Sequence, residues 1–469
     1  MFFNSLTFLV FIAIFLGCFF ATRGRGRLWV CLIGSYVFYG WWDVRFLSLI
    51  VASTGIDYVV ADRIERAVDP RRRKQLLIVS LISNLGMLFT FKYFNFFRDS
   101  LAELARSFGV TLDYPTLNII LPVGISFYTF QTLSYTIDVY RGRLTPERSL
   151  LKFAVFVAFF PQLVAGPIVR ARDFLPQLSR DRRFNWNHVV AGSVLILCGF
   201  FKKCVVADSL APYVDSVFAV PQLQTSATML LGVFFYAFQI YGDFSGYSDI
   251  AIGLAKVMGY TFPVNFRRPY FADSFSDFWQ RWHISLSSWL RDYLYIPLGG
   301  NRRGPRRTYI NLMLTMLIGG LWHGAAWTFV VWGGLHGFYL IAQRLVSNIW
   351  SPPSNRAMRW VSGVVVFTLV CAAWIFFRAT SFGNAMDVYQ RIFAMDKMTI
   401  GGIQNKIIAG KGFALIAVLV GCEAMSGRVR LQARCIADPW FLMSFVILVG
   451  LAIAWLGTFG TASFIYFQF

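Results

Sequence analysis

The feature that most restricts the fold of this chain is a series of apolar runs that begins almost at once and continues nearly to its end. A helix needs about 20 apolar residues to cross a bilayer, within a range of about 17–25. Candidate runs lie at residues 5–21, 28–42, 46–60, 76–97, 115–137, 150–168, 188–206, 226–258, 278–298, 309–322, 325–343, 360–378, 409–423 and 439–457. Because the chain is 57% hydrophobic and only 14% charged, a water-soluble fold would expose large apolar surfaces. We therefore predict an all-α polytopic membrane protein that a lipid bilayer surrounds.

The basic residues gather in short loops between the apolar runs, as they do in the cytoplasmic loops of membrane proteins. These basic clusters lie at residues 23–27, 71–74, 141–148, 170–183, 302–307 and 428–434. We assign the clusters to the cytoplasm and both termini to the other side. The formal charge of +21 therefore indicates membrane topology, and we exclude nucleic acid as a partner.

Two segments depart from simple spans. Residues 150–168 lie between two basic loops and end in FFPQLVAGPIVR, whose prolines and glycine predict a hairpin or re-entrant element entered from the cytoplasm. Residues 226–258 are too long for one straight span, and glycines around Asp243, Tyr247 and Asp249 predict a broken helix. Buried carboxylates are costly in a membrane, so Asp243 and Tyr247 are candidates for substrate contact. The alternative is a structural network that holds two half-helices together.

No internal repeat or soluble segment divides the chain, so we predict a single integral-membrane domain over residues 1–469, with a catalytic core at about 115–345. The first apolar run lacks a basic segment before it and a clear cleavage site, which indicates a retained helix and not a signal peptide. The seven cysteines form no CxxC pair. We predict no metal site and no permanently bound cofactor.

Two of the four histidines, His283 and His323, lie in segments otherwise rich in Trp, Leu, Ile and Gly. A neutral imidazole tolerates burial and exchanges a proton near neutral pH. We predict His323 as the reactive base and His283 as its companion, with Trp282 and Trp322 beside them. If residues 278–298 form one helix, an apolar face carries His283, and a packed core histidine is the alternative.

The remaining histidines are predicted to have other roles. His336 follows His323 by 13 residues, which in one continuous helix would place it about 220° around the axis and roughly 20 Å along it. Because the two could not then share a reaction centre, we predict a structural role for His336. His188 begins an apolar run in a polar, basic context and is predicted at the membrane interface.

The segment GGNRRGPRR combines glycines and arginines at a predicted cytoplasmic edge. Its Arg302 and Arg303 are candidates for binding the phosphates of an anionic donor such as coenzyme A. The alternative is that these arginines only set the membrane topology. The chain lacks the P-loop, GxSxG, HExxH and GxGxxG patterns, which argues against a serine hydrolase, a zinc protease and a dinucleotide-binding enzyme.

At these residues the sequence resembles the membrane-bound O-acyltransferase family, and within it the branch of bacterial alginate O-acetyltransferase membrane subunits. The resemblance covers roughly residues 30–345 and weakens after about 350. The stretches that carry it are SYVFYGWWDVRFL, LPVGISFYTFQTLSYTIDVYRG, FFPQLVAGPIVR, YGDFSGYSDIAIGLAKVMGY, FWQRWHISLSSWLRDYLYIPLGGNRRG and GGLWHGAAWTFVVWGGLHG.

The resemblance implies a fold and an activity. The family's catalytic histidine falls on His323, and its second active-site position falls on His283. The implied fold is a ring of about ten to thirteen transmembrane and re-entrant helices around a central funnel. The implied activity is O-acetylation of an exported, alginate-like polysaccharide. Acetyl-CoA enters from the cytoplasm of a bacterial cell, and the acetyl group crosses the inner membrane to an extracytoplasmic partner acetyltransferase.

Three other readings stay open at this point. A transporter with a midplane polar site would use Asp243 and Asp249 and would show no thioester turnover. A membrane scaffold would tolerate replacement of both predicted active-site histidines. Within the enzyme class, the acceptor could instead be peptidoglycan, cellulose or teichoic acid, because no residue pattern in the chain identifies the polymer.

Overall fold

The computed structural model describes residues 1–111, 120–349, 355–396, 398–400, 403–425, 427–459 and 464–465, and every regular element in these ranges is helical. Within them, seven helical stretches are long and apolar enough to cross a membrane. They are Val44–Arg66, Pro70–Ser107, Trp186–Ala219, Ser226–Val257, Arg356–Arg378, Asn405–Ala424 and Pro439–Leu456. The predicted all-α polytopic fold is thus confirmed, whereas the arrangement of helices around a funnel stays a prediction.

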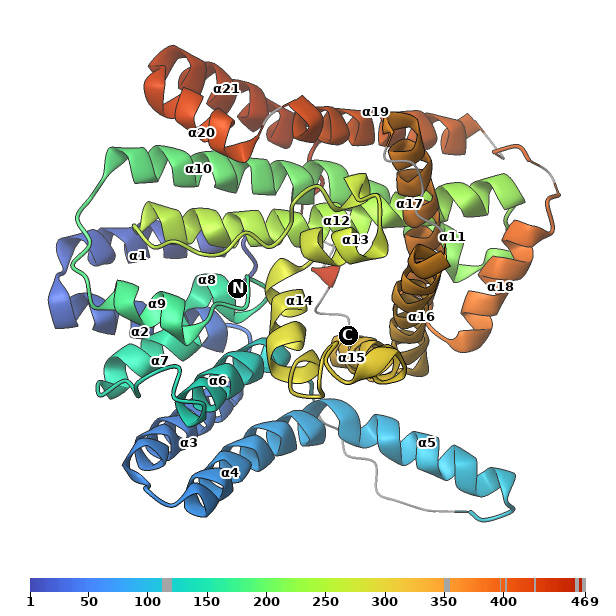
Figure 1. The fold of residues 1–469 in the computed structure, drawn as a ribbon. Coiled ribbons are helices and arrows are strands. Elements are labelled where there is room, and N and C mark those ends of the chain that lie inside the picture. Colours follow the sequence, from blue (N-terminus) through green and yellow to red (C-terminus); the bar gives the residue numbers. More distant parts are fainter. Residues whose placement is uncertain are drawn as a thin grey trace. The chain divides into compact units, whose positions relative to one another are not determined.

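The chain forms two compact units, whose helices are labelled in Figure 1. Unit 1 comprises Met1–Trp186 with Met258–Phe262, and unit 2 comprises Asn187–Val257 with the described residues from Pro263 onward. The helices of unit 1 are α1 (Leu6–Ala21), α2 (Gly24–Gly40), η1 (Val44–Phe46), α3 (Leu47–Arg66), α4 (Pro70–Leu88), η2 (Phe89–Tyr93), α5 (Phe94–Ser107), α6 (Ile125–Tyr140), α7 (Leu150–Ala158), α8 (Phe160–Leu163) and α9 (Ala171–Leu178).

Unit 2 contains the helices that follow, of which α10 begins at the boundary. They are α10 (Trp186–Phe200), η3 (Phe201–Ala207), α11 (Asp208–Ala219), η4 (Pro221–Leu223), α12 (Ser226–Val257), η5 (Pro269–Phe271), α13 (Phe275–Arg281), α14 (Ile284–Leu290), η6 (Arg291–Tyr295), α15 (Gly304–His323), α16 (Trp327–Ile349), α17 (Arg356–Arg378), α18 (Phe382–Phe393), α19 (Ile403–Met425), α20 (Arg428–Ala437) and α21 (Pro439–Leu456).

Side-chain caps explain where several helices begin. Asp69 accepts a hydrogen bond from the Arg71 N–H ahead of α4, and Asp438 accepts from Trp440 ahead of α21, with proline at the first helical position of both. Proline lacks the N–H that would be unsatisfied there, and the cap supplies an acceptor for the next free donor. These short polar residues therefore mark the ends of apolar helices that composition alone would not delimit.

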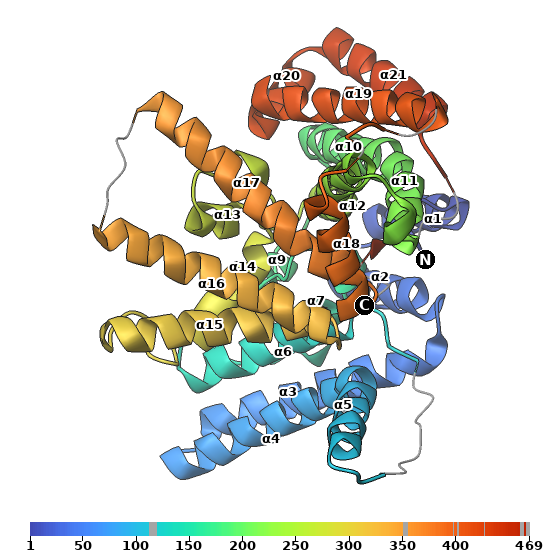
Figure 2. The ribbon, with the colours of Figure 1, turned by 90° about the vertical axis from the view of Figure 1, so that its right-hand side faces the viewer.

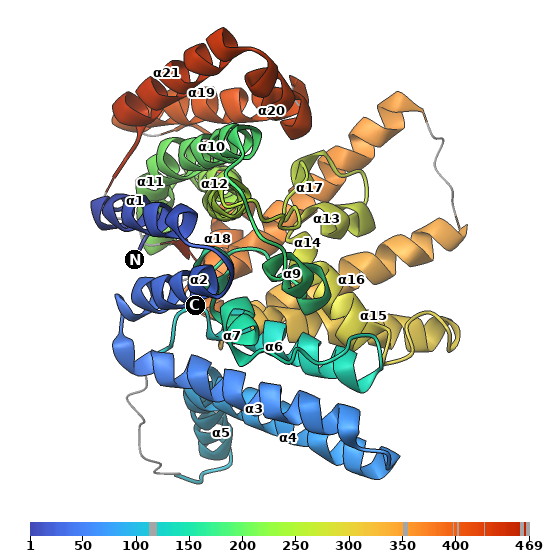
Figure 3. The same cartoon turned by 90° about the vertical axis from the view of Figure 1, so that its left-hand side faces the viewer.

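A buried polar network joins three helices of unit 1, of which α3 and α4 run side by side in Figure 3. Asp57 of α3 accepts hydrogen bonds from Asn84 (2.8 Å), Thr136 (2.9 Å) and the hydroxyl of Ser80. Polar side chains that satisfy one another hold membrane helices together without a hydrophobic driving force. This network therefore fixes α3 against α4 and α6.

The segment 150–168 is broken, as its prolines predict. Helix α7 stops at Ala158, and the four-residue α8 begins after Phe159. The break frees the Phe160 N–H, which donates to the Ser35 hydroxyl at 3.0 Å, and Gln162 donates to the Phe156 carbonyl at 2.6 Å. Irregular backbone persists in a membrane protein where other protein groups satisfy it. A re-entrant path from the cytoplasm stays a prediction.

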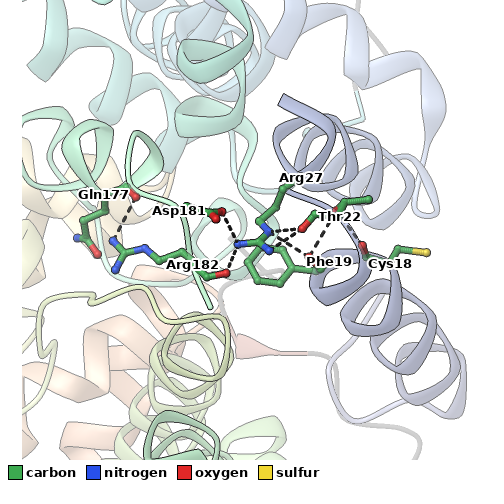
Figure 4. Close-up of polar contacts among 7 residues, drawn as sticks. All are labelled: Cys18, Phe19, Thr22, Arg27, Gln177, Asp181 and Arg182. Atoms are coloured by element: carbon green, nitrogen blue, oxygen red, sulfur yellow. Dashed lines mark hydrogen bonds and ion pairs between the residues drawn. The ribbon is translucent and has the colours of Figure 1, made fainter. Parts of the chain in front are cut away.

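A buried arginine ties the α1–α2 turn to the chain that follows α9 (Figure 4). The Arg27 guanidinium donates to the carbonyls of Phe19 and Thr22, each at 3.0 Å, and pairs with Asp181 at 3.4 Å. It also donates to the backbone carbonyl of Arg182, whose side chain lies over the Tyr260 ring. One guanidinium thus joins three separate parts of unit 1.

Helix α12 is continuous over Ser226–Val257, so the predicted break around Asp243 is wrong. Its glycines serve close packing instead. A Cβ on Gly246 would lie 2.7 Å from the Gly199 carbonyl oxygen, and one on Gly253 would lie 2.6 Å from that of Gly192. Because glycine alone lets two backbones approach this closely, α10 and α12 pack side by side through glycines spaced seven residues apart (Figure 1).

Helices α15 and α16 form an antiparallel pair with the same kind of contact (Figure 2). Gly320 and Gly333 face each other, with a Cβ on Gly333 only 2.3 Å from the Met316 carbonyl oxygen. At the other end of the pair, Arg344 donates to the Asn301 side chain at 3.3 Å. The glycine contact thus brings the chain after α15 directly back along it.

Candidate active site

His323 is the last residue of α15, and its side chain is 4% exposed. The chain then turns through Gly324 and enters α16 at Trp327. A Cβ on Gly324 would lie 2.1 Å from the Phe329 ring, so only glycine allows that ring to close over the turn. The predicted glycine break after His323 is therefore present, and it leaves the imidazole at a helix end and not within a helix.

His283 lies between two short helices, α13 and α14, in the left-handed region with φ of 42°. The prediction of one helical face over residues 278–298 is therefore wrong. A non-glycine residue in this region is uncommon, although histidine is among those enriched there, and such strain clusters at functional sites.

A buried asparagine stabilises the turn at His283. The Asn265 carbonyl accepts from the Ile284 N–H at 2.9 Å, and its side-chain oxygen accepts from the Ser285 N–H (3.1 Å) and hydroxyl (2.9 Å). The Asn265 amide nitrogen donates in turn to the Ser248 hydroxyl of α12 at 3.2 Å. Residues 258–274, between α12 and α13, form a segment that we call the strap. Through Asn265, the strap supports the strained residue His283 on one side and joins it to α12 on the other.

The structure brings the two predicted active-site histidines together. The ring centroids of His283 and His323 lie 6.3 Å apart, and Trp322 contacts both rings at 5.9 and 5.0 Å. Phe244 of α12 packs edge-on against His283 at 4.6 Å, and Phe377 of α17 packs against His323 at 5.3 Å. Two imidazoles from separate elements thus meet inside an aromatic enclosure.

The other predicted aromatic neighbour, Trp282, lies in the wall of this enclosure. It is 1% exposed, and its ring lies 5.0 Å from Phe266 and 5.0 Å from Trp374. Trp332 of α16 contacts both Trp374 and His323. Trp282 therefore shapes the site through packing.

His336 is fully buried behind the site. Helix α15 ends before α16 begins, so the single helix assumed for His323 and His336 does not exist. Both imidazole rings contact Trp332, with centroid distances of 5.0 Å for His323 and 4.8 Å for His336. The structural role of His336 stays a prediction.

Asp243 and Tyr247 lie one turn apart on α12. Lys203 pairs with Asp243 at 2.5 Å and with Asp208 at 2.7 Å, and we call these three residues the lysine triad. The backbone N–H of Ile465 donates to the other Asp243 oxygen at 2.8 Å. These contacts fit a structural network, and direct substrate contact by Asp243 or Tyr247 stays a prediction.

A short piece of the C-terminal chain lies beside the same turn of α12. The Phe464 ring is 4.6 Å from Tyr247 and 6.0 Å from Phe244, the residue that packs on His283. Phe464 and Ile465 are 2% and 5% exposed. Sequence reasoning missed this neighbour of the site, because the two segments lie more than 200 positions apart and no local pattern joins them.

Arg302 and Arg303 lie in the exposed glycine-rich loop that precedes α15. Three glycines of this loop, Gly299, Gly300 and Gly304, have positive φ, which fixes its path. Because α15 has 20 residues, the loop and His323 are separated by a helix about 30 Å long. Contact of these arginines with a donor stays a prediction.

Two further charged residues lie inside an apolar run, and the sequence motifs did not indicate a role for them. Lys202 and Lys203 are consecutive cations inside an apolar run, and such residues in a membrane helix require partners. Lys202 pairs with Asp249 (3.3 Å) and Glu423 (3.1 Å), and Arg428 pairs with Asp249 (2.6 Å). The π-helical η3 carries both lysines, whose ammonium groups pair with different carboxylates.

Chemically, the enclosure offers imidazole nitrogens in a site from which bulk water is excluded. A neutral imidazole is a suitable general base near neutral pH. Water exclusion strengthens electrostatic interactions and limits hydrolysis of a reactive acyl group. Among the described residues, no cluster of His, Cys, Asp or Glu has the arrangement of a metal site.

Comparison with known proteins adds a family relationship. Residues 147–383 match the model of the MBOAT, membrane-bound O-acyltransferase family. This range includes His283 and His323, the two histidines predicted for the active site, and the strap that supports His283. It corresponds to half of the chain, in the part where the candidate site lies.

Similarity to known bacterial proteins extends over more of the chain. The probable alginate O-acetylase AlgI of Azotobacter vinelandii is 44% identical over 407 residues, covering 86% of this chain and 80% of that protein. The peptidoglycan O-acetyltransferase of Helicobacter pylori is 36% identical, covering 80% of this chain and 75% of that protein. The teichoic acid D-alanyltransferase of Bacillus subtilis is 28% identical over 57% of this chain and 71% of that protein.

Proposed function

Because the chain belongs to the membrane-bound O-acyltransferase family and is thus a multi-pass membrane enzyme, we propose that it moves an acetyl group from cytoplasmic acetyl-CoA across the membrane. The acetyl group then serves O-acetylation of an exported, alginate-like polysaccharide. The observation that carries the proposal is the meeting of two buried imidazoles, His283 and His323, at 6.3 Å inside an aromatic enclosure. We further propose that residues 1–469 form a single integral-membrane domain, which lies in the inner membrane of a bacterial cell.

In the proposed reaction, His323 takes the proton from the acceptor hydroxyl while the hydroxyl oxygen attacks the thioester carbonyl. The tetrahedral intermediate then releases coenzyme A as the C–S bond breaks, and the imidazolium returns its proton to the leaving sulfur. His283 orients the reactants from the strained turn that Asn265 supports. Preorganised groups of this kind lower the barrier without reorganisation during the reaction.

The names of the relatives bear on two points: which group is transferred, and which polymer accepts it. The names of the two more similar relatives specify O-acetylation of alginate and of peptidoglycan, and the less similar one specifies D-alanylation of teichoic acid. We therefore propose acetyl as the group transferred and alginate-like polysaccharide as the first acceptor to test. An extracytoplasmic acetyltransferase is the proposed partner, and Arg302 and Arg303 are proposed to contact the donor's phosphates.

Replacement of each histidine in turn tests the proposal. Cells that carry His323→Gln are expected to lose polymer acetylation by at least 100-fold, because a general base contributes typically 10²–10⁴-fold. His283→Gln should also lower acetylation, whereas His188→Gln, at the predicted interface, should retain it. Membrane insertion of each variant is measured by quantitative immunoblotting of membranes.

A donor assay separates the proposed chemistry from the choice of polymer. Proteoliposomes that contain the wild-type protein are supplied with acetyl-CoA, the proposed extracytoplasmic acetyltransferase and the acceptor polysaccharide. The free thiol of the released coenzyme A is then titrated. If His323→Gln acetylates the acceptor at the wild-type level, with equal amounts of inserted protein, His323 is not the base. Thiol release with peptidoglycan but not alginate oligosaccharides would instead correct only the acceptor.

A further inference from the structure

Unit 2 contains a cavity of about 550 Å³ that no step of the proposed reaction uses. Aromatic side chains from separate elements line it: Phe234 and Phe238 of α12, Tyr270 of η5, and Phe367 of α17. Trp360 of α17 also lines the cavity and is 62% exposed. Ligand cavities of this size accept a drug-sized or lipid-sized group. The apolar walls therefore favour a hydrocarbon chain in the interior.

The mouth of the cavity is basic. Arg356 and Arg359 lie in the first turn of α17, and neither forms an ion pair with a residue that the structure describes. Arg281 also lines the mouth but is committed to Asp277 at 2.7 Å, and one carboxylate, Asp273, lies at the same rim. The rim thus carries a net positive charge, to which the N-terminal end of the helix dipole of α17 adds.

The dimensions match one leaflet of a bilayer. Arg356 at the rim and Phe367 in the interior are 11 residues apart on α17, a rise of about 16 Å. Half of a bilayer's hydrocarbon core is about 15 Å thick. A molecule with its phosphate at the rim would therefore extend a chain to the middle of the membrane along this wall.

The topology predicted from the basic loops also places the rim on the side where anionic lipids concentrate. Arg344, near the end of α16, bonds to Asn301 beside the basic loop at 302–307, which the positive-inside rule assigns to the cytoplasm. Helix α17 begins a few residues after α16 ends, so its basic first turn lies on this same side. The cytoplasmic leaflet carries a negative surface potential from its anionic lipids.

We propose that this cavity binds an anionic phospholipid of the cytoplasmic leaflet, with its phosphate on Arg356 and Arg359 and one acyl chain along the aromatic wall. The bound chain would pack on Tyr270, whose ring lies 6.0 Å from that of Trp282. Trp282 immediately precedes His283, so lipid occupancy would support the wall of the active site. The lipid site does not depend on the identity of the acyl donor or acceptor.

Lipid binding is tested on the full-length protein in nanodiscs of phosphatidylcholine with or without phosphatidylglycerol. Thermal stability and lipid retention by native mass spectrometry are measured for the wild type and for Arg356→Gln/Arg359→Gln. We expect phosphatidylglycerol to stabilise the wild type. The double variant should lose about 30-fold in affinity for it, since each basic residue near an anionic surface contributes about fivefold.

Two further variants make the test specific. Arg71→Gln/Arg72→Gln removes the same charge from the exposed first turn of α4, which is predicted on the same side, and it should keep the phosphatidylglycerol effect. Gly363→Phe fills the cavity while leaving its rim charged, and it should abolish lipid retention. A Cβ at Gly363 meets only the Ala272 carbonyl oxygen, at 3.5 Å, so the backbone there accepts a side chain.

Three results would overturn the proposal. The first is equal stability of the wild type in the two lipid mixtures. The second is an equal loss in both arginine double variants, which would assign the effect to surface charge alone. The third is lost coenzyme A binding with unchanged phosphatidylglycerol binding in Arg356→Gln/Arg359→Gln, which would assign the cavity to the donor. None of these readouts requires polymer acetylation, so they stand apart from a failure of the proposed reaction.

Discussion

Replacing Asn265 with alanine tests whether the strained turn at His283 is held in place by the side chain of this residue. The amide oxygen of Asn265 accepts two hydrogen bonds from Ser285, at 3.1 and 2.9 Å. A neutral buried hydrogen bond contributes about 0.5–1.5 kcal/mol net, so Asn265→Ala removes about 1–3 kcal/mol from the turn. Without this support, His283 would leave the left-handed region, which costs about 1–3 kcal/mol to occupy.

The expected result is a fall in activity without loss of the protein. If the lost free energy acts wholly on the active geometry, kcat/KM for acetyl transfer falls by about 5- to 150-fold, since about 1.4 kcal/mol corresponds to a factor of ten. The assay is thiol release from acetyl-CoA in proteoliposomes with equal amounts of inserted protein. Ser248→Ala is the matched control, because it removes only the bond to the Asn265 amide nitrogen.

Two outcomes would refute this reasoning. Activity of Asn265→Ala within twofold of wild type would show that the backbone alone holds His283. An equal loss in Ser248→Ala would show that the contact with α12, and not the bonds to Ser285, positions the turn. A separate melting measurement in detergent distinguishes both outcomes from general unfolding.

Three other substitutions test the packing and the buried charges. Gly246→Leu should lower the melting temperature of the purified protein sharply, because its Cβ would lie 2.7 Å from a backbone oxygen, whereas Gly450→Leu, which meets nothing within 4 Å, should not. Lys203→Met should greatly reduce the amount of folded protein, because it leaves the buried carboxylates of Asp208 and Asp243 without their cation. Adding Asp208→Asn and Asp243→Asn to this variant should restore folded protein, and no recovery would refute the charge argument. Arg27→Gln should lower the melting temperature and exposed Arg25→Gln should not, since only Arg27 joins three parts of unit 1; equal effects would contradict this.

Much of the fold could be predicted from the sequence, because the apolar runs, the basic loops and the prolines act locally. The break after α7 follows from Pro161 and the residues that flank it. The glycines around Asp243 were misread, since glycine has two uses that a sequence does not distinguish. It loosens a helix in isolation, but in α12 it allows a neighbouring backbone to approach, and the packing favours a continuous helix.

The candidate site shows the same limit. His283 and His323 were predicted as site residues from their chemistry, because an ionisable imidazole among aromatic residues in a membrane is a strong signal. The left-handed turn at His283 could not be predicted, since it depends on Asn265 in a strap whose sequence carries no motif. The contact of Phe464 with α12 likewise arises from the folded path of the chain and not from any local pattern.

The glycine seam between α10 and α12 restricts how the enzyme can move. Both helices place glycines seven residues apart, so an alternative fit requires a slide of about 10.5 Å along the axis. Smaller slides would drive side chains into the opposing backbone, so α10 and α12 can move only together, as one rigid body. Phe244 of α12 therefore keeps its position relative to α10, and any separation of Phe244 from His283 requires the whole helix pair and the turn at His283 to move relative to each other.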